Sequence, residues 1–115
     1  MKESVIMRLD RNNFDRIKAG TKVWEIRLND DKRKGINPGD SIVFMRRPEL
    51  EERLPMVVEE KLLFSDVQRL LDKVALGEIA PPEMTEVEWI QSFLSHYRPE
   101  ELVQYGVVAF KLKNT

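Results

Sequence analysis

Residues 20–28, GTKVWEIRL, carry the pattern on which the fold prediction for this 115-residue chain depends. Successive side chains of a strand point to opposite faces, so Trp24, Ile26 and Leu28 share one face of the predicted strand. That face is apolar and is expected in the core. The other face carries Glu25 and Arg27, two opposite charges two positions apart. It is expected either in solvent or on the wall of a cleft.

The charges on this strand allow two interpretations. In solvent, Glu25 and Arg27 form an ion pair that contributes about 0–1 kcal/mol. In a cleft, Glu25 fixes the guanidinium of Arg27 so that its donors face a phosphate or a base edge. Lys22 lies two positions after Gly20, a predicted helix end, and would point into the same cleft from its rim. The spacing of the charges does not decide between the two.

The rest of the chain predicts an α+β fold. Hydrophobic patterns predict strands at 4–9, 20–28, 41–45, 56–64 and 105–112, and residues 29–40 as a charged loop. Helices are predicted between Asp10 and Gly20, after Ser65, and after Thr85, the last ending at Arg98-Pro99. The order is β-α-β-β-β-α-α-β, with strands two to four as an antiparallel meander. We expect a single domain, residues 1–115, with a curved mixed or antiparallel sheet, a small open barrel, and helices packed at its ends.

Finer packing predictions concern strand 56–64 and the last helix. Met56, Val58, Leu62 and Phe64 are expected on one face of the strand. The side chains expected in the core from the last helix are Trp89, Ile90, Phe93, Leu94 and Tyr97. Capping boxes are expected at Ser65 with Gln68 and at Thr85 with Glu88.

Composition excludes several classes of protein. The chain has 42% hydrophobic and 34% charged residues, with no cysteine and one histidine. Disulfides and thiolate or histidine-cluster metal sites are therefore excluded, and no cofactor is expected. No apolar run reaches the roughly 18 residues of a membrane span, and the N-terminus lacks a secretory pattern. We expect a cytoplasmic protein without a membrane partner; the sequence leaves its oligomeric state open.

The charges are unevenly distributed along the chain. Residues 1–47 contain 12 Lys/Arg and 7 Asp/Glu, a balance of +5, whereas residues 48–115 contain 7 and 13, a balance of −6. If the first part forms one surface, it attracts a polyanion locally. The alternative is that these charges are scattered and solvated, and the net charge of −1 argues against sequence-blind binding to a duplex.

The motif in residues 20–28 resembles a known signature. Gly20, Lys22, Glu25 and Arg27 spell G-x-K-x-x-E-x-R, the signature of the ASCH domain family in the PUA-like superfamily. Further similar segments, covering nearly the whole chain, are Met7 with Leu9, FDRIKAG, INPGDSIVF and YGVVAFKL. The resemblance implies a PUA-like pseudo-barrel closed by helices.

The resemblance also implies RNA binding in a cleft beside the signature strand. Lys22, Glu25 and Arg27 would be the cleft residues, and the RNA would be single-stranded or present a flipped nucleotide. Lys22 and Arg27 would contact phosphate, while Glu25 would accept from a base amino group, as carboxylates do with cytosine. Tyr97, Tyr105 and Trp24 are candidate stacking platforms, with Trp24 expected in the core and Tyr97 packed there with its hydroxyl reaching water.

Two other functions remain open. Some relatives of this family are amidohydrolases acting on acylated cytidine, and the resemblance would assign catalysis to Lys22, Glu25 and Glu83; a ribonuclease using Lys22 is a variant of this idea. Glu25 occupies the position of a threonine in those relatives, and a carboxylate there favours the ammonium form of Lys22 over a nucleophilic amine. A protein-interaction module in transcription or translation is the other alternative.

Additional basic contacts are expected outside the signature. Lys32 and Arg33 belong to a basic loop tip, and Arg46 ends the next strand. They either extend a nucleic-acid-binding surface or are solvated charges partly cancelled by neighbouring aspartates. His96 is expected to complement the C-terminal dipole of its helix.

Overall fold

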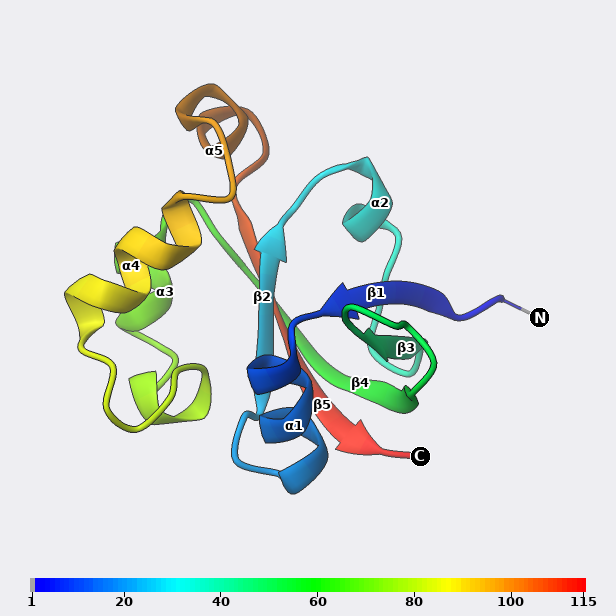
Figure 1. Cartoon of the computed structure of the whole chain (residues 1–115). Coiled ribbons are helices and arrows are strands. Elements are labelled where there is room, and N and C mark those ends of the chain that lie inside the picture. The colour runs from blue at the N-terminus through cyan, green and yellow to red at the C-terminus, as the bar shows by residue number, and fades with distance from the viewer. Residues whose placement is uncertain (1) are drawn as a thin grey trace.

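The computed structural model describes residues 2–115, whose helices and strands follow one another as labelled in Figure 1. The strands are β1 (Val5–Leu9), β2 (Trp24–Leu28), β3 (Ser41–Arg46), β4 (Arg53–Phe64) and β5 (Val107–Asn114). The helices are α1 (Arg11–Ala19), α2 (Asp31–Lys34), α3 (Val67–Leu71), the 3₁₀ turn η1 (Leu76–Glu78), α4 (Glu86–Leu94) and α5 (Pro99–Tyr105).

The five strands form one curled sheet in the order β1-β3-β4-β5-β2. β1 and β3 are parallel, and the other neighbouring strands are antiparallel. The curl produces a half-barrel, with α3 and α4 on one side of β2 and α1 near its lower end (Figure 1). The predicted α+β fold with a curved mixed sheet and packed helices is therefore confirmed.

The predicted meander of strands two to four is wrong in one pairing. β3 and β4 are antiparallel neighbours, as expected, but β2 pairs with β5 at the far edge of the sheet. Residues 31–34 form α2 within the predicted loop, and Asp30 caps it by accepting from the backbone N–H of Arg33. The chain continues from α2 to β3, which lies beside β1 rather than β2.

Two hydrophobic cores lie on opposite faces of β5. Val108 and Phe110 belong to the core inside the half-barrel, together with Phe14 of α1 and Phe44 of β3. Val107 and Ala109 face the second core, which is closed by α3 and α4 and contains Trp24 and Ile26. The expected burial of Trp24, Ile26 and Leu28 is confirmed.

Strand β4 serves both cores because a bulge interrupts its register. The pairing with β5 shifts between Val58 and Glu60. Met56 and Val58 consequently lie in the half-barrel core, whereas Leu62 and Phe64 pack against the second core. The prediction that these four side chains share one face is wrong, since it assumed an unbroken alternation.

Helix ends follow local chemistry in most cases. Asp10 accepts from the backbone N–H of Asn13, and Gly20 ends α1 in the left-handed conformation, φ +84°. The Thr85–Glu88 capping box is confirmed. The cap of α3 is Asp66, not Ser65, because the carboxylate accepts from the backbone N–H of Arg69.

The C-terminal region differs from the prediction in two respects. α4 ends at Leu94, which is exposed, not buried. Pro99 then begins α5, in the position where proline is favoured because the first helical N–H needs no partner.

Within residues 2–115 no helix is both long and apolar enough to cross a bilayer.

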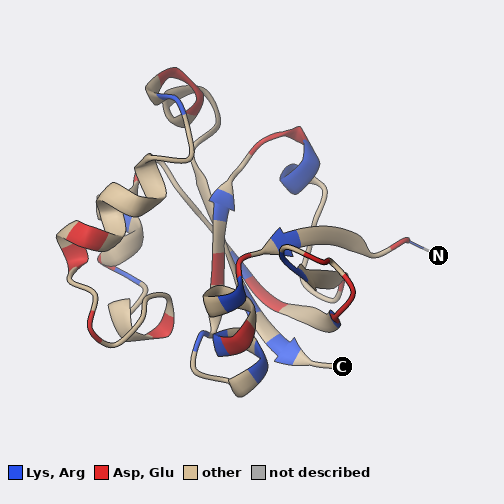
Figure 2. Ribbon diagram, viewed as in Figure 1, with Lys and Arg blue, Asp and Glu red and all other residues tan. Residues whose placement is uncertain are grey.

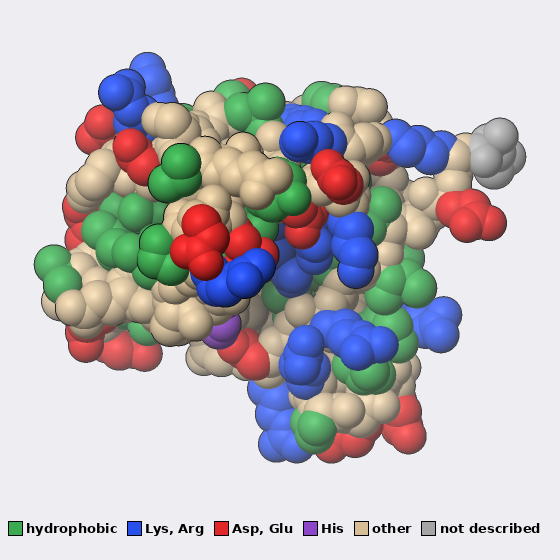
Figure 3. Space-filling model, turned by 90° about the horizontal axis from the view of Figure 1, so that it is seen from above, with side chains coloured by type: hydrophobic (Ala, Val, Ile, Leu, Met, Phe, Trp, Pro, Cys, Tyr) green, Lys and Arg blue, Asp and Glu red, His purple; other side chains and the backbone are tan. Residues whose placement is uncertain are grey.

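The charge asymmetry of the sequence has a spatial counterpart. Lys and Arg mark α2, parts of α1 and the end of β1, whereas the first turn of α4 is acidic (Figure 2). Seen from above, most visible Lys and Arg side chains lie on the half of the molecule that contains β1 (Figure 3).

Candidate functional site

A cavity of about 470 Å³ lies along the free edge of β2. Its lining comes from β2, the start of α1, one face of α4, and the segment after β3. Lys22, Glu25 and Arg27 all line it. The charged face of the signature strand therefore borders a hollow rather than a convex surface.

One wall of the cavity is a buried chain of three charges. Nζ of Lys22 lies 2.9 Å from Oε1 of Glu25, and Nε of Arg27 donates to Oε2 of Glu25 at 2.6 Å. Glu25 is 3% exposed and Lys22 8%. Each carboxylate oxygen is thus held by a different cation.

Further hydrogen bonds connect these charges to the neighbouring elements. Nζ of Lys22 also donates to Oδ1 of Asn13 on α1 at 2.9 Å. The same oxygen accepts from Nη2 of Arg16 at 2.6 Å. Nη2 of Arg27 donates to the backbone carbonyl of Arg8 on β1 at 3.1 Å. The network therefore joins α1, β2 and β1, and Arg27 bridges the two edge strands of the half-barrel.

Electrostatics keep Glu25 ionised in this buried position. Burial would raise its pKa, but Lys22 and Arg27 act in the opposite direction and lower the pKa of Glu25 to about 2. The site holds two cations around one carboxylate and retains a net positive charge.

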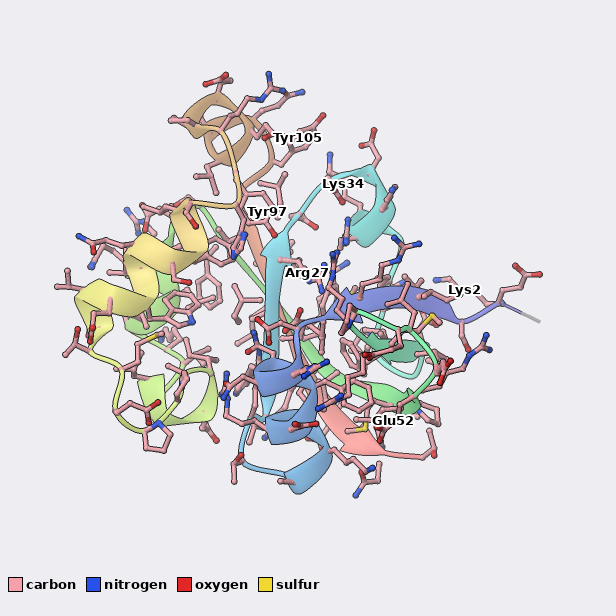
Figure 4. All side chains as sticks on the ribbon, viewed as in Figure 1. Lys2, Arg27, Lys34, Glu52, Tyr97 and Tyr105 are labelled. Carbon is pink, nitrogen blue, oxygen red and sulfur yellow. The ribbon has the colours of Figure 1, made fainter. Side chains whose placement is uncertain are left out.

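The opposite wall is aromatic. Trp89, Phe93 and Tyr97 are four residues apart and therefore share one face at and just beyond α4. The rings of Trp89 and Phe93 stack with centroids 5.3 Å apart, and those of Phe93 and Tyr97 are 5.1 Å apart. Burial raises the pKa of Tyr97, with Arg27 partly opposing it. Figure 4 shows Tyr97 and Arg27 near one another at the upper end of β2.

The cavity lining also contains residues that sequence reasoning did not assign to the site: Asp10, Asn13, Arg47, Ser92 and His96. Asp10 was predicted only as a helix cap. Arg47 stood beside Arg46 in the sequence, and nothing in that doublet distinguishes which arginine faces the cavity. Arg47 is exposed, and its side chain makes no ion pair within residues 2–115.

Several predicted site residues lie outside the cavity lining. Nε of Arg46 pairs with Asp15 at 3.1 Å, and Arg33 pairs with Asp30 at 3.1 Å. Lys32 is exposed on α2. Glu83 is exposed in the turn before α4.

The two other candidate platforms also lie elsewhere. Trp24 is in the second core, as expected. Tyr105 lies under Lys34, whose Nζ is 5.4 Å from the ring centroid (Figure 4). Of the three candidate platforms, Tyr97 is therefore the one that lines the cavity.

The donor set does not suit a metal ion. Among residues 2–115 no three His, Asp or Glu side chains are grouped as metal ligands. Both oxygens of Glu25 are already occupied by cations. The cavity lining offers hydrogen bonding, charge and stacking to a ligand.

One known protein family matches nearly the whole of this chain. The ASCH domain profile matches residues 7–115. The chain belongs to the ASCH domain family. ASCH domains are generally thought to bind RNA. No curated protein matches this ASCH chain significantly.

Solved structures share the fold along nearly the whole chain. The crystal structure of hypothetical protein PH0355 is 29% identical, with a TM-score of 0.86 over 98% of this chain and 100% of the other. The solution structure of protein PF0455 from Pyrococcus furiosus is also 29% identical, with a TM-score of 0.75 over 96% of each chain. ASCH from Zymomonas mobilis is 17% identical and shares the fold with a TM-score of 0.62, over 95% of this chain and 66% of the other.

Proposed function

We propose that this ASCH domain binds single-stranded RNA by taking one nucleotide into the cavity beside β2. The observation that supports this most strongly is that one cavity has a cationic wall and an aromatic wall. Lys22 and Arg27 stand on one wall, and Trp89, Phe93 and Tyr97 on the other. Proteins that hold single-stranded nucleic acid combine cationic groups with aromatic rings on which bases stack.

The size of the cavity favours a single nucleotide over a duplex. About 470 Å³ lies at the lower end of the range for small-molecule sites, roughly 300–1,000 Å³. A-form duplexes are recognised along their exposed grooves and phosphates, which requires a broad surface rather than a hollow of this size. Arg47 at the rim is free to contact the backbone phosphate of the bound nucleotide.

The geometry gives less support to hydrolysis by Lys22. A nucleophilic lysine needs its neutral amine, whereas the Nζ of Lys22 contacts the ionised Glu25 and donates to Asn13. Glu83, the second expected catalytic carboxylate, does not line the cavity. Binding without Lys22 chemistry is therefore the function we propose.

The test is a titration of ¹⁵N-labelled protein with a short single-stranded RNA of mixed sequence and with a hairpin duplex. The single strand is expected to shift the amides of residues 20–28 and 89–97 at low salt, and the duplex is expected to bind more weakly. Unchanged amides in both segments would refute the proposal.

A matched pair of charge deletions locates the binding surface. Arg47→Ala removes an exposed cation from the rim and is expected to weaken RNA binding and reduce the salt slope by about 0.7. Arg69→Ala removes another exposed cation, from α3 and outside the cavity, and is expected to leave binding unchanged. Equal losses from the two variants would contradict binding in the cavity.

A further inference from the structure

At the inner end of the cavity, hydrogen-bond donors are available to a ligand, whereas the carboxylate of Glu25 is already occupied. A lysine ammonium has three donors and an arginine guanidinium five. Within residues 2–115, Lys22 contacts Glu25 and Asn13, and Arg27 donates to Glu25 and the carbonyl of Arg8. One donor remains on Lys22 and three on Arg27.

Glu25 is unsuited to the base-reading role that its sequence position suggested. Both of its oxygens are held by cations, and the side chain is almost completely buried. Accepting a hydrogen bond from a base amino group would require breaking one of these contacts. The carboxylate therefore positions Lys22 and Arg27, which in turn face the ligand.

The two donors are arranged to meet neighbouring acceptors. Lys22 and Arg27 converge on the two oxygens of one carboxylate, so they stand close enough to donate to two adjacent acceptors on a ligand. Guanine offers such a pair, O6 and N7, to which Lys and Arg donate in other nucleic-acid complexes. Adenine replaces O6 with an amino group, which would face these donors without an acceptor.

The walls favour a base at the inner end and phosphate at the rim. Trp89 and Phe93 are nearly buried and offer apolar ring surface to a planar base. A phosphate placed there would lose its hydration while Glu25 offsets one of the two nearby cations. Arg47 can instead meet the phosphate in contact with water.

We propose that the cavity selects a 6-keto purine, guanine in RNA, over adenine, by donating from Lys22 and Arg27 to O6 and N7. This selectivity rests on the proposed function, since it assumes that the nucleotide enters the same cavity. Glu25 acts as a positioning residue, holding both donors in place.

The test compares GMP, IMP and AMP by ¹⁵N amide shifts at constant ionic strength. The three share ribose and phosphate, and IMP carries the keto group without the 2-amino group of guanine. GMP and IMP are expected to bind about tenfold more tightly than AMP, the effect of a two-acceptor contact. Equal affinities for all three would overturn the selectivity.

Outcomes of this comparison separate the two proposals. If all three nucleotides bind equally and Arg47→Ala weakens each of them, RNA binding in the cavity stands and base selectivity falls. If none of them, and no single-stranded RNA, shifts residues 20–28, both proposals fall.

Two variants distinguish base recognition from phosphate binding. Arg27→Lys keeps the charge but removes the guanidinium fork, so GMP affinity is expected to approach that of AMP. Arg47→Ala is expected to weaken all three nucleotides by the same factor. Selectivity for GMP that survives Arg27→Lys in the folded variant, or that disappears in Arg47→Ala, would overturn the assignment of Arg27 to the base and Arg47 to the phosphate. The comparison of the three nucleotides on the wild-type protein depends on neither variant.

Discussion

Glu25→Gln tests the charged network of the cavity through its pH dependence. In the folded protein Lys22 and Arg27 hold the pKa of Glu25 at about 2, against an ordinary value of 4.5. Each pKa unit corresponds to about 1.4 kcal/mol, so ionised Glu25 contributes about 3 kcal/mol to the free energy of unfolding.

The sign of this linkage follows from the lowered pKa. The unfolded state takes up the proton more readily than the folded state as the pH falls below about 4.5. The contribution is therefore fully present above pH 5 and is lost as the pH approaches 2. Other carboxylates titrate in the wild type and in the variant alike, so their effects cancel in the difference between the two.

The assay is urea unfolding of wild type and Glu25→Gln at a series of pH values between 2 and 7. The stability advantage of the wild type is expected to be largest at neutral pH and to shrink by about 3 kcal/mol on acidification. Glu52→Gln, at an exposed carboxylate outside the cavity, is the control for a Glu-to-Gln change as such. A difference that stays constant with pH for Glu25→Gln would refute the buried network.

A second measurement does not depend on the stability of the variant. The side-chain carboxyl ¹³C shift of Glu25, followed in the folded wild-type protein, is expected to titrate with a midpoint near 2. A midpoint at the ordinary value of 4.5 would show that the two cations do not act on this carboxylate as described.

Three further perturbations test other parts of the fold. Gly106→Ala places a Cβ 2.8 Å from the carbonyl oxygen of Phe64 at φ +71°, and should lower the free energy of unfolding in urea by about 2 kcal/mol or more. The control Gly77→Ala places a Cβ with nothing within 4 Å and should cost far less; similar losses at the two positions would contradict the strain. Thr85→Ala removes the side-chain half of a capping box and should lower the free energy of unfolding by about 1 kcal/mol, and an unchanged urea midpoint would argue against the cap. The tyrosinate absorbance of Tyr97, assigned by its loss in Tyr97→Phe, should appear at a pH above the ordinary pKa of 10 because burial raises it; a midpoint at or below 10 would place the ring in water.

The part of the site that could be predicted from the sequence is the part that lies close together in it. Lys22, Glu25 and Arg27 fall within six residues, and strand alternation places Glu25 and Arg27 on one face. Alternation likewise predicted the buried face of Trp24 and Ile26. Hydrophobic period and cap chemistry are local properties, so α1 and the start of α4 were predicted as well.

The remainder depends on contacts between distant segments. The pairing of β2 with β5 is a choice among strands of similar composition, which no local pattern specifies. Asn13 and Arg47 reach the cavity only because α1 and the segment after β3 are folded against β2. The sequence already placed Glu25 beside Arg27 and Lys22, but the burial that leaves both of its oxygens occupied depends on the elements packed around β2.

The position of β5 inside the sheet has a consequence for how the protein is made. β5 lies between β4 and β2, so β2 pairs with a segment that follows β3 and β4 in the sequence. Until residues 107–114 leave the exit tunnel, β2 has no neighbouring strand for backbone hydrogen bonds, and the side chains around Glu25 are not held in position. The nascent chain therefore acquires its cavity in a late, long-range step, the kind that folds slowly and leaves strand edges unprotected during translation.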